Sequence, residues 1–532
     1  MLTKIISFFL ENKFLTFLFL SLLIILGIQS FFNLKMDAFP DVTNIQVEIV
    51  ATSPTLSPIE MEKFVTYPLE NSLRGIPGLS TIRSTTKFGI SVITAIFKDD
   101  VDIYFARQQV FERISGIMGK LPEGVDVEIG PITTAMGEIY QYTLEWEKPP
   151  SNNEVENLTR LRTIQDYLVA PLLKTVEGVS DINSFGGYIQ QINILTDPLK
   201  LYKFNLSLND IYDALKNNNL NVGGGIISKH SEQLIVQGIG MFSSIQDIER
   251  IVVKSVDGIP VYLKDVADVN FSHAFRKGGA IKDGREEVVG GIVMMLRGEN
   301  SREVVKRVEK KVDEINRENI LPNGLKIKPY YKRSEIIEKS INGVVKAILE
   351  GAILVIFVIF LFIRQLRGAL IVVLSLPLTA FFTFLLMRIF NISANLMSLG
   401  GIAISIGMIV DASIIQVENV QRHINESVGE RFSTVLKSVL EVRKPSIFGE
   451  IIISSVFLPI FSLQGMEGKM FSPLAITVII ALICSLTISI LFVPSLCYIF
   501  LSSSRKGETF LVTFAKRIYL PVLQFALKRK FI

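Results

Sequence analysis

Residues 400–419 read GGIAISIGMIVDASIIQVEN, and this stretch decides how the rest of the chain is interpreted. It lies in an apolar run that is long enough to cross a membrane as a helix, yet it contains two carboxylates, Asp411 and Glu418. A charged side chain at the centre of a bilayer costs roughly 2.5–3.5 kcal/mol on insertion scales, so intramembrane acids usually serve a function. The stretch therefore predicts a membrane helix that contains a functional acidic site.

The spacing of the two acids predicts where they lie in that helix. Asp411 precedes Arg422 by ~16 Å at 1.5 Å per residue, which is about half of the ~30 Å hydrocarbon core. Glu418 follows at ~100° per residue on the same face. Three further residues lie near that face, where a neighbouring helix could approach closely: Met397, Gly400 and Gly407. This acidic stripe favours a proton path, and the alternatives are a carboxylate paired for structure or a helix that lines a cavity passively.

Composition predicts a membrane protein with a large soluble part. Hydrophobic residues make up 49% of the 532 residues and charged residues 20%. Six apolar runs have spanning length: 14–34, 342–363, 368–387, 392–417, 446–463 and 471–501. The net charge of +4 gives no reason to expect nucleic acid as a partner.

Basic residues predict the orientation of these runs. Lys and Arg gather at one end of the runs, at Arg364, Arg367, 422–444, Arg505 and Lys506. The positive-inside rule makes that end and the N-terminus cytoplasmic, so the segment 35–340 lies outside. Both cysteines, Cys484 and Cys497, fall in the sixth run, and an external segment without cysteine is typical of a bacterial periplasm. The first run is expected to be an uncleaved anchor.

The external segment has two copies of a β-α-β-β-α-β pattern, the ferredoxin-like unit. In the first copy we predict strands at 44–52, 79–86, 90–97 and 125–129 and helices at 57–74 and 102–119. In the second we predict strand 138–144, helix 154–176, a hairpin around Gly186-Gly187, strand 287–296, helix 302–316 and strand 325–331. An insertion at 196–275 contains a helix at 207–218 and a glycine-rich hairpin from Val222, which is expected to dock on a neighbouring subunit.

The end of the chain repeats its beginning. Residues 526–532 are similar to 10–15, just before the first apolar run, and 508–527 has the pattern of an amphipathic helix on the cytoplasmic face. We therefore expect a seventh span and a second copy of the whole pattern to follow, as in a duplicated transporter.

Other residues point less clearly to a site. Glu450 is a third membrane acid, which either assists a proton path or reaches back to the cytoplasmic interface. Thioethers suit Cu(I) and Ag(I), but core packing is the commoner role of methionine, and it is expected for Met136, Met241, Met294 and Met295. The histidines are scattered. There is no phosphate-binding loop and no nucleophile motif, so the sequence predicts neither an enzyme nor a bound cofactor.

Seven further segments are similar to one known family. They are DAFPDVTN at 37–44, VTYPLE at 65–70, GIPG at 75–78, DIYFARQ at 102–108, GEIYQY at 137–142, MMLRGEN at 294–300 and GMEGKMFSP at 465–473. Together with Val410-Asp411 and Glu418-Asn419, they resemble the N-terminal half of a resistance-nodulation-division (RND) efflux pump of the heavy-metal subgroup. The resemblance implies a homotrimer in the bacterial inner membrane that exports metal cations in exchange for protons. It also implies a periplasmic adaptor and an outer-membrane channel as partners.

The resemblance assigns roles to individual residues. Asp411 matches the essential proton-carrying acid and Glu418 its partner, and Met397 matches a methionine of a metal relay in the copper/silver branch. Ser405 stands where the cobalt-zinc-cadmium branch has a second aspartate, whereas 465–473 is more similar to that branch. Monovalent and divalent metals both stay open.

The resemblance also implies the fold class, an α+β membrane protein whose external segment forms a porter region of two subdomains. Its expected parts are 1–34 (cytoplasmic N-terminus and first transmembrane helix), 35–135 (first porter subdomain), 136–195 with 276–335 (second porter subdomain), 196–275 (docking insertion), 336–501 (transmembrane helices two to six) and 502–532 (cytoplasmic helix and start of a second half). Two alternatives remain: a pump for amphiphilic organic compounds, and a non-transporting gene fragment or a half that awaits its partner. We expect that these 532 residues alone do not pump.

Overall fold

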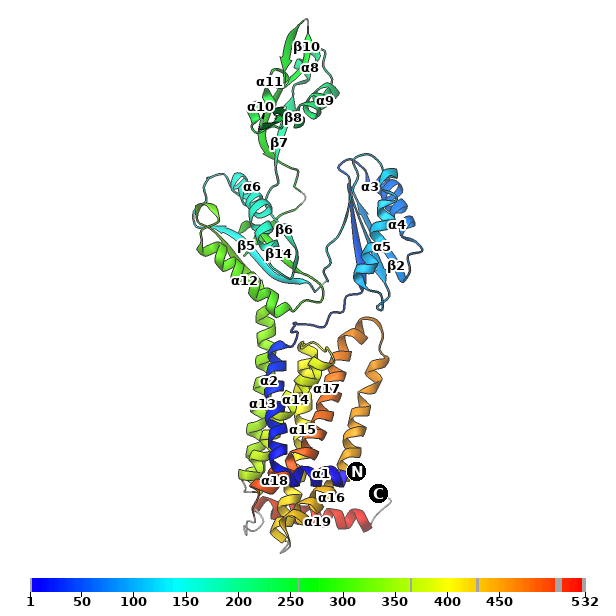
Figure 1. Cartoon of the computed structure of the whole chain (residues 1–532), viewed down its shortest axis with the longest axis vertical. Coiled ribbons are helices and arrows are strands. Elements are labelled where there is room, and N and C mark those ends of the chain that lie inside the picture. The colour runs from blue at the N-terminus through cyan, green and yellow to red at the C-terminus, as the bar shows by residue number, and fades with distance from the viewer. Residues whose placement is uncertain are drawn as a thin grey trace.

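The computed structural model describes residues 2–134, 136–230, 232–256, 258–276, 278–363, 366–426, 430–502 and 510–528. A helical bundle forms one end of the molecule, two sheet-containing units lie beside each other above it, and a small insertion forms the far end (Figure 1). Arg364, Arg505 and Lys506, which helped to predict the orientation, lie outside the described residues. The same holds for 529–532, most of the segment that repeats the start of the chain.

Six helices of the described part are long and apolar enough to cross a membrane, as predicted. They are α2 (Lys13–Asn33), α13 (Arg333–Ile363), α14 (Leu366–Ile389), α15 (Leu396–Glu426), α16 (Arg431–Val456) and α17 (Gly465–Leu491). The last continues into α18 (Val493–Phe500), while α1 (Leu2–Glu11) and α19 (Phe510–Lys528) lie across the end of the bundle away from the sheets (Figure 1). A buried apolar core joins α14, α15, α16 and α17, with Val372, Val417, Val439 and Ile488 among its members.

One predicted boundary in the bundle is wrong. The fourth and fifth apolar runs were predicted to end at 417 and begin at 446, with the charges of 422–444 between them, but α15 continues to Glu426 and α16 begins at Arg431. The charged residues interrupt the apolar run, but the helical periodicity continues through them. Val435, Val439 and Arg443 recur every four residues, and all three are buried.

The first sheet-containing unit has the predicted ferredoxin-like topology. Strands β1 (Ile45–Thr52), β2 (Leu79–Lys87), β3 (Ile90–Phe97) and β4 (Asp126–Ile129) form an antiparallel sheet in the order β2-β3-β1-β4. Helices α3 (Pro58–Met61), α4 (Tyr67–Leu73) and α5 (Ile103–Ser115) pack on it around Ile49, Leu69, Ile93 and Val110. The Asp102 side chain caps α5 by accepting from the backbone N–H groups of Tyr104 and Phe105.

The second unit repeats this topology, with one correction. Strands β5 (Glu138–Trp146), β6 (Val179–Phe185), β14 (Glu286–Met295) and β15 (Leu325–Lys332) lie in the order β6-β14-β5-β15, and the short strand β13 (Ala280–Lys282) pairs with the start of β14. Helices α6 (Glu154–Ile164), α7 (Ala170–Lys174) and α12 (Ser301–Arg317) accompany the sheet.

The correction is that no hairpin forms around Gly186-Gly187. The next strand, β7 (Gln190–Thr196), pairs with β12 (Ala267–His273) and forms a stem to the insertion. Both glycines have positive φ, and a Cβ at Gly186 would lie 2.0 Å from the carbonyl oxygen of Val288. The glycines therefore turn the chain past β14 and out of the sheet.

The insertion carries an exposed hairpin, as predicted. It contains α8 (Pro198–Lys203), α9 (Leu208–Asn218), α10 (Ile245–Glu249), β10 (Val252–Val256), β11 (Ile259–Tyr262) and α11 (Leu263–Val266) around a small apolar core. Strands β8 (Val222–Lys229) and β9 (Glu232–Gly238) pair with each other, and each of their residues is exposed.

Both units contain a π-helical turn before a proline, a feature that was not predicted from the sequence. A π-helical turn, Glu62–Thr66 in the first unit and Gln165–Val169 in the second, precedes a proline, Pro68 or Pro171. A proline ring clashes with the carbonyl group four residues before it in a regular α-helix, and that carbonyl falls within the π-helical turn in both units. The wider turn therefore lets each helix pass its proline.

A short segment, residues 35–44, connects the bundle to the sheets, and we call it the strap. Met36 forms a parallel bridge with Ala394, directly before α15. The N–H group of Ala394 donates to the carbonyl oxygen of Lys35 (2.8 Å), and that of Leu396 donates to Ala38 (3.1 Å). Asp37 of the strap pairs with Arg333 at the start of α13 (3.4 Å), and burial raises the pKa of Asp37 although Arg333 opposes that effect.

Candidate functional site

The centre of α15 holds the acid that the sequence singled out. Asp411 lies midway between Leu396 and Glu426, the first and last residues of the helix. Five residues at spacings of three or four form an exposed face, which we call the acidic stripe: Ile404, Gly407, Asp411, Ile415 and Glu418. Asp411 and Glu418 thus share one face, about 10 Å apart along the helix axis.

The two acids of the stripe have no partner in the described part of the chain. Neither Asp411 nor Glu418 forms a hydrogen bond or ion pair with another described residue. The other faces of α15 pack against α13, α14, α16 and α17. A carboxylate without a partner at mid-membrane depth is costly when ionised, so its free energy depends strongly on protonation. This arrangement suits a group that binds and releases a proton.

Within the described residues, the close helix approach occurs at Gly401, about a quarter of a turn away from the stripe. A Cβ at Gly400 or Gly407 would meet no atom within 4 Å, because both positions face open space. A Cβ at Gly401 would instead lie 2.5 Å from Thr477 Oγ1 and 2.9 Å from the carbonyl oxygen of Leu474. Gly401 therefore admits α17, and Gly400 and Gly407 leave the stripe uncovered within the described chain.

Glu450 lies in a different environment from the stripe. Its Oε1 is 3.4 Å from an Arg443 nitrogen and accepts a hydrogen bond from Ser446 (3.3 Å), and its side chain is 12% exposed. Both partners lie on its own helix, α16, and neither belongs to the stripe. The structure thus does not bring Glu450 together with Asp411 and Glu418 through any of these contacts.

Arg443 is a residue that the sequence analysis missed. It was counted among the cytoplasmic charges, but its side chain is fully buried between α16 and α15. It donates to Gln416 Oε1 (2.8 Å) and to the carbonyl oxygen of Ala412 (2.7 Å), both on α15. The four-residue spacing of Val435, Val439 and Arg443 was the available signal, and it placed the arginine on an apolar helix face.

The candidate metal ligands do not form a site among the described residues. No group of three or more His, Cys, Asp or Glu side chains there is arranged to hold a metal ion. Met397 lies in the first turn of α15 and is partly exposed. Met294 and Met295 are buried in the second unit, as core packing predicts, whereas Met241 of the insertion is 58% exposed and does not pack in a core.

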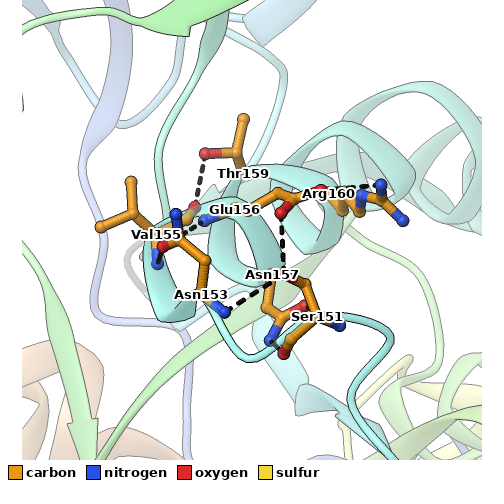
Figure 2. Close-up of polar contacts among 7 residues, drawn as sticks. All are labelled: Ser151, Asn153, Val155, Glu156, Asn157, Thr159 and Arg160. Carbon is orange, nitrogen blue, oxygen red and sulfur yellow. Dashed lines mark hydrogen bonds and ion pairs between the residues drawn. The ribbon is translucent and has the colours of Figure 1, made fainter.

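A cavity of about 780 Å³ lies between α6 and the β7/β12 stem, with Trp146, Phe271 and His273 in its wall. Polar groups at the start of α6 border it, but they bind one another (Figure 2). Asn153 Oδ1 accepts from the N–H groups of Val155 and Glu156, and Glu156 pairs with Arg160 (2.8 Å). These groups cap the helix, so we do not place the functional site there.

Comparisons with known proteins agree with the motifs. The family model described as "AcrB/AcrD/AcrF family" matches residues 5–532. The chain is 42% identical to protein HelA of Legionella pneumophila and 42% identical to the cobalt-zinc-cadmium resistance protein CzcA of Cupriavidus metallidurans. Each match covers 98% of this chain and 50% of the relative. The chain therefore spans about half the length of the curated relatives it matches.

A solved structure gives the same answer for the fold. The crystal structure of a heavy metal efflux pump superimposes with a TM-score of 0.82 at 34% identity, over 96% of this chain and 49% of that one. The sequence identity, the sheet topology and the six apolar helices all indicate the same family. The chain belongs to the AcrB/AcrD/AcrF family of RND transporters, and the relatives that it matches include heavy-metal efflux proteins.

Proposed function

We propose that this chain is part of an inner-membrane pump that exports heavy-metal cations in exchange for protons. The observation that carries the proposal is Asp411, which lies at the middle of an apolar helix and has no partner for its side chain among the described residues. Glu418 lies on the same stripe, nearer the end of α15 that points away from the sheets. Protonation neutralises such an acid and changes which neighbour can lie against it, so proton flow can be linked to a change of conformation. The chain acts as a transporter and not as an enzyme.

The connection between α15 and the sheets supports this coupling. The strap is hydrogen-bonded to the residues just before and at the start of α15, and it leads directly into β1. Lys469 of α17 pairs with Asp99 after β3 (2.5 Å) and also donates to Asn44 Oδ1 at the end of the strap (3.2 Å). The route from Asp411 to the first sheet thus runs along about 22 Å of α15 and then through the backbone contacts of the strap.

We propose the remaining assembly from the family. A second, similar half covers the acidic stripe, three protomers associate, and an adaptor and an outer-membrane channel complete the route across the envelope. The sheets lie in the periplasm in this arrangement, and the β8/β9 hairpin inserts into a neighbouring protomer. We propose porter subdomains at 35–135 and at 136–195 with 276–335, and the pairing of β7 with β12 in the stem supports counting β7 with the insertion.

We propose that the cargo is a divalent cation. The 42% identity to a protein named for cobalt, zinc and cadmium resistance supports this choice, as does the stretch at 465–473. Ser405 is buried and donates to the carbonyl oxygen of Gly401, so it packs α15 at the place where that branch has a second aspartate. The cation is transported as the substrate of the pump.

The test is metal efflux by the assembled pump in a host without its own metal pumps. Cells that carry the pump should accumulate less Co²⁺, Zn²⁺ or Cd²⁺ than cells that carry Asp411→Asn. A matched control removes an exposed carboxylate of α12 by Asp313→Asn and should behave like the parent. Efflux of Ag⁺ or Cu⁺ alone would overturn the divalent assignment, and efflux of a dye alone would overturn metal transport.

A further inference from the structure

We infer that Arg443 is a positioning residue that fixes the rotation of α15 and thereby the direction of the acidic stripe. The residue lies on α16, and none of its side chain is exposed. It donates three hydrogen bonds, to Gln416 Oε1 (2.8 Å), to the carbonyl oxygen of Ala412 (2.7 Å) and to Glu450 Oε1 (3.4 Å). Two of these three acceptors belong to α15, so one side chain holds two successive turns of that helix.

The two held positions lie between and beside the acids. Ala412 directly follows Asp411, and Gln416 lies two residues before Glu418. At ~100° per residue, Ala412 and Gln416 point about a third of a turn away from the stripe. A rotation of α15 that changed the direction of Asp411 would therefore pull both acceptors away from Arg443.

The guanidinium group is suited to this task because of its shape. Its planar fork can bind a side-chain amide and a backbone carbonyl at the same time, which a lysine ammonium cannot do with the same directionality. Glu450 supplies the opposite charge that a buried guanidinium requires. Arg443 thus binds two uncharged acceptors on α15, while the carboxylate that balances its charge lies on its own helix, α16.

Two buried polar atoms of the cluster lack hydrogen-bond partners among the described residues, which argues against a purely stabilising role. These atoms are Gln416 Nε2 and Glu450 Oε2. A buried donor and a buried acceptor without partners destabilise a fold, and apolar side chains of the same volume would avoid that cost. A role in holding α15 accounts for a polar cluster at this place, whereas packing does not.

Cysteine reactivity in the purified 532-residue chain tests the inference without any transport assay. Cys484 and Cys497 are first replaced by alanine, and a reporter is placed at Ser413, which is 1% exposed, or at Ile415, which is 51% exposed. N-ethylmaleimide should label Ile415→Cys and leave Ser413→Cys nearly unlabelled. Arg443→Met with Glu450→Met removes the grip without leaving a buried charge, and should raise the labelling rate of Ser413→Cys by roughly tenfold, since a charge-assisted hydrogen bond is lost.

A second pair of variants applies if the double variant does not fold. Arg443→Lys keeps the charge but loses the fork and should also raise the labelling of Ser413→Cys. Glu450→Gln keeps both bonds to α15 and should leave the labelling unchanged. Equal labelling in these two variants, or no change in the double variant, would overturn the inference.

The effect on transport rests on the proposed function. In the assembled pump, Arg443→Lys should lower the maximal rate and leave the half-saturating metal concentration unchanged, because Arg443 is buried away from the sheets and the strap. If Asp411→Asn transports normally while the labelling rates change as expected, the proposed function fails and the positioning role of Arg443 stands.

Discussion

The two faces of α15 differ although they belong to one continuous helix. On the buried face, Gly401 lies against α17, and Ala412 and Gln416 are held by Arg443 of α16. On the exposed face, Asp411 and Glu418 have no partner among the described residues. The polar groups of the first face help to fix the helix in the fold. Those of the second cost free energy in an apolar environment and are available to something outside this chain.

The largest expected effect is the loss of transport on Asp411→Asn. Asparagine has nearly the same shape but cannot carry the proton, so metal efflux by the assembled pump should fall by roughly 100-fold or more, the contribution of a positioned proton-transfer group. Membrane insertion and trimer formation should be unchanged, because Asp411 makes no contact that holds the described fold. Normal efflux by this variant would remove the functional distinction between the two faces.

The next effect concerns stability and compares one glycine from each face. Gly401→Ala would place its methyl group against Thr477 and a backbone carbonyl, and this overpacking should destabilise the chain by about 1–3 kcal/mol. Gly407→Ala meets no atom and should stabilise the helix by about 0.5–1 kcal/mol. Thermal unfolding of the purified chain in detergent measures both changes. Equal shifts would mean that the two faces are packed alike.

Glu418→Gln should reduce transport less than Asp411→Asn does. Glu418 lies four residues before Arg422, near the end of α15 where water offers another proton route. The loss in initial efflux rate should therefore stay well below the roughly 100-fold expected for a positioned acid. A loss as complete as that of Asp411→Asn would show that both acids of the stripe are essential.

The smallest effect is expected for Ile415→Ala. Ile415 is exposed, so its truncation should change the stability of the 532-residue chain by less than about 0.5 kcal/mol. Val417→Ala is the matched variant on the buried face, where Val417 is 2% exposed and part of the bundle core, and it should cost more. If a second half covers the stripe, Ile415→Ala should destabilise the assembled pump although it leaves the chain alone unchanged.

Much of the fold could be predicted from the sequence because its determinants are local. Lipid requires long uninterrupted apolar helices, which gave the six spans, and alternation with period two between glycine turns gave both ferredoxin-like units. The hairpin around Gly186-Gly187 was wrong because the pattern shows that a chain turns there but not which strand it meets next. The π-helical turns could not be predicted from the 3.6-residue periodicity, because the apolar pattern continues through them and only the proline that follows requires the wider turn.

Only the part of the candidate site that depends on α15 alone could be predicted from the sequence. The shared face of Asp411 and Glu418 follows from their spacing alone. For Arg443, the four-residue spacing with Val435 and Val439 indicates an apolar helix face, but it does not show the acceptors on α15 that allow the arginine to be buried. Its burial depends on acceptors that another helix supplies. The choice of Gly401 over Gly400 as the packing position likewise depends on where α17 lies.

The strap limits how α15 can move. Its backbone is bonded to the start of α15 through Ala394 and Leu396, while Asp37 in the same short segment binds Arg333, and Arg333 also donates to the carbonyl oxygen of Met136 at the edge of the second unit. A shift of α15 along its own axis would strain the bonds of Ala394 and Leu396 to the strap, whereas a tilt about its sheet-facing end would strain them less. The strap therefore holds the sheet-facing end of α15 in place, and a tilt about that end would move the opposite end of the helix furthest.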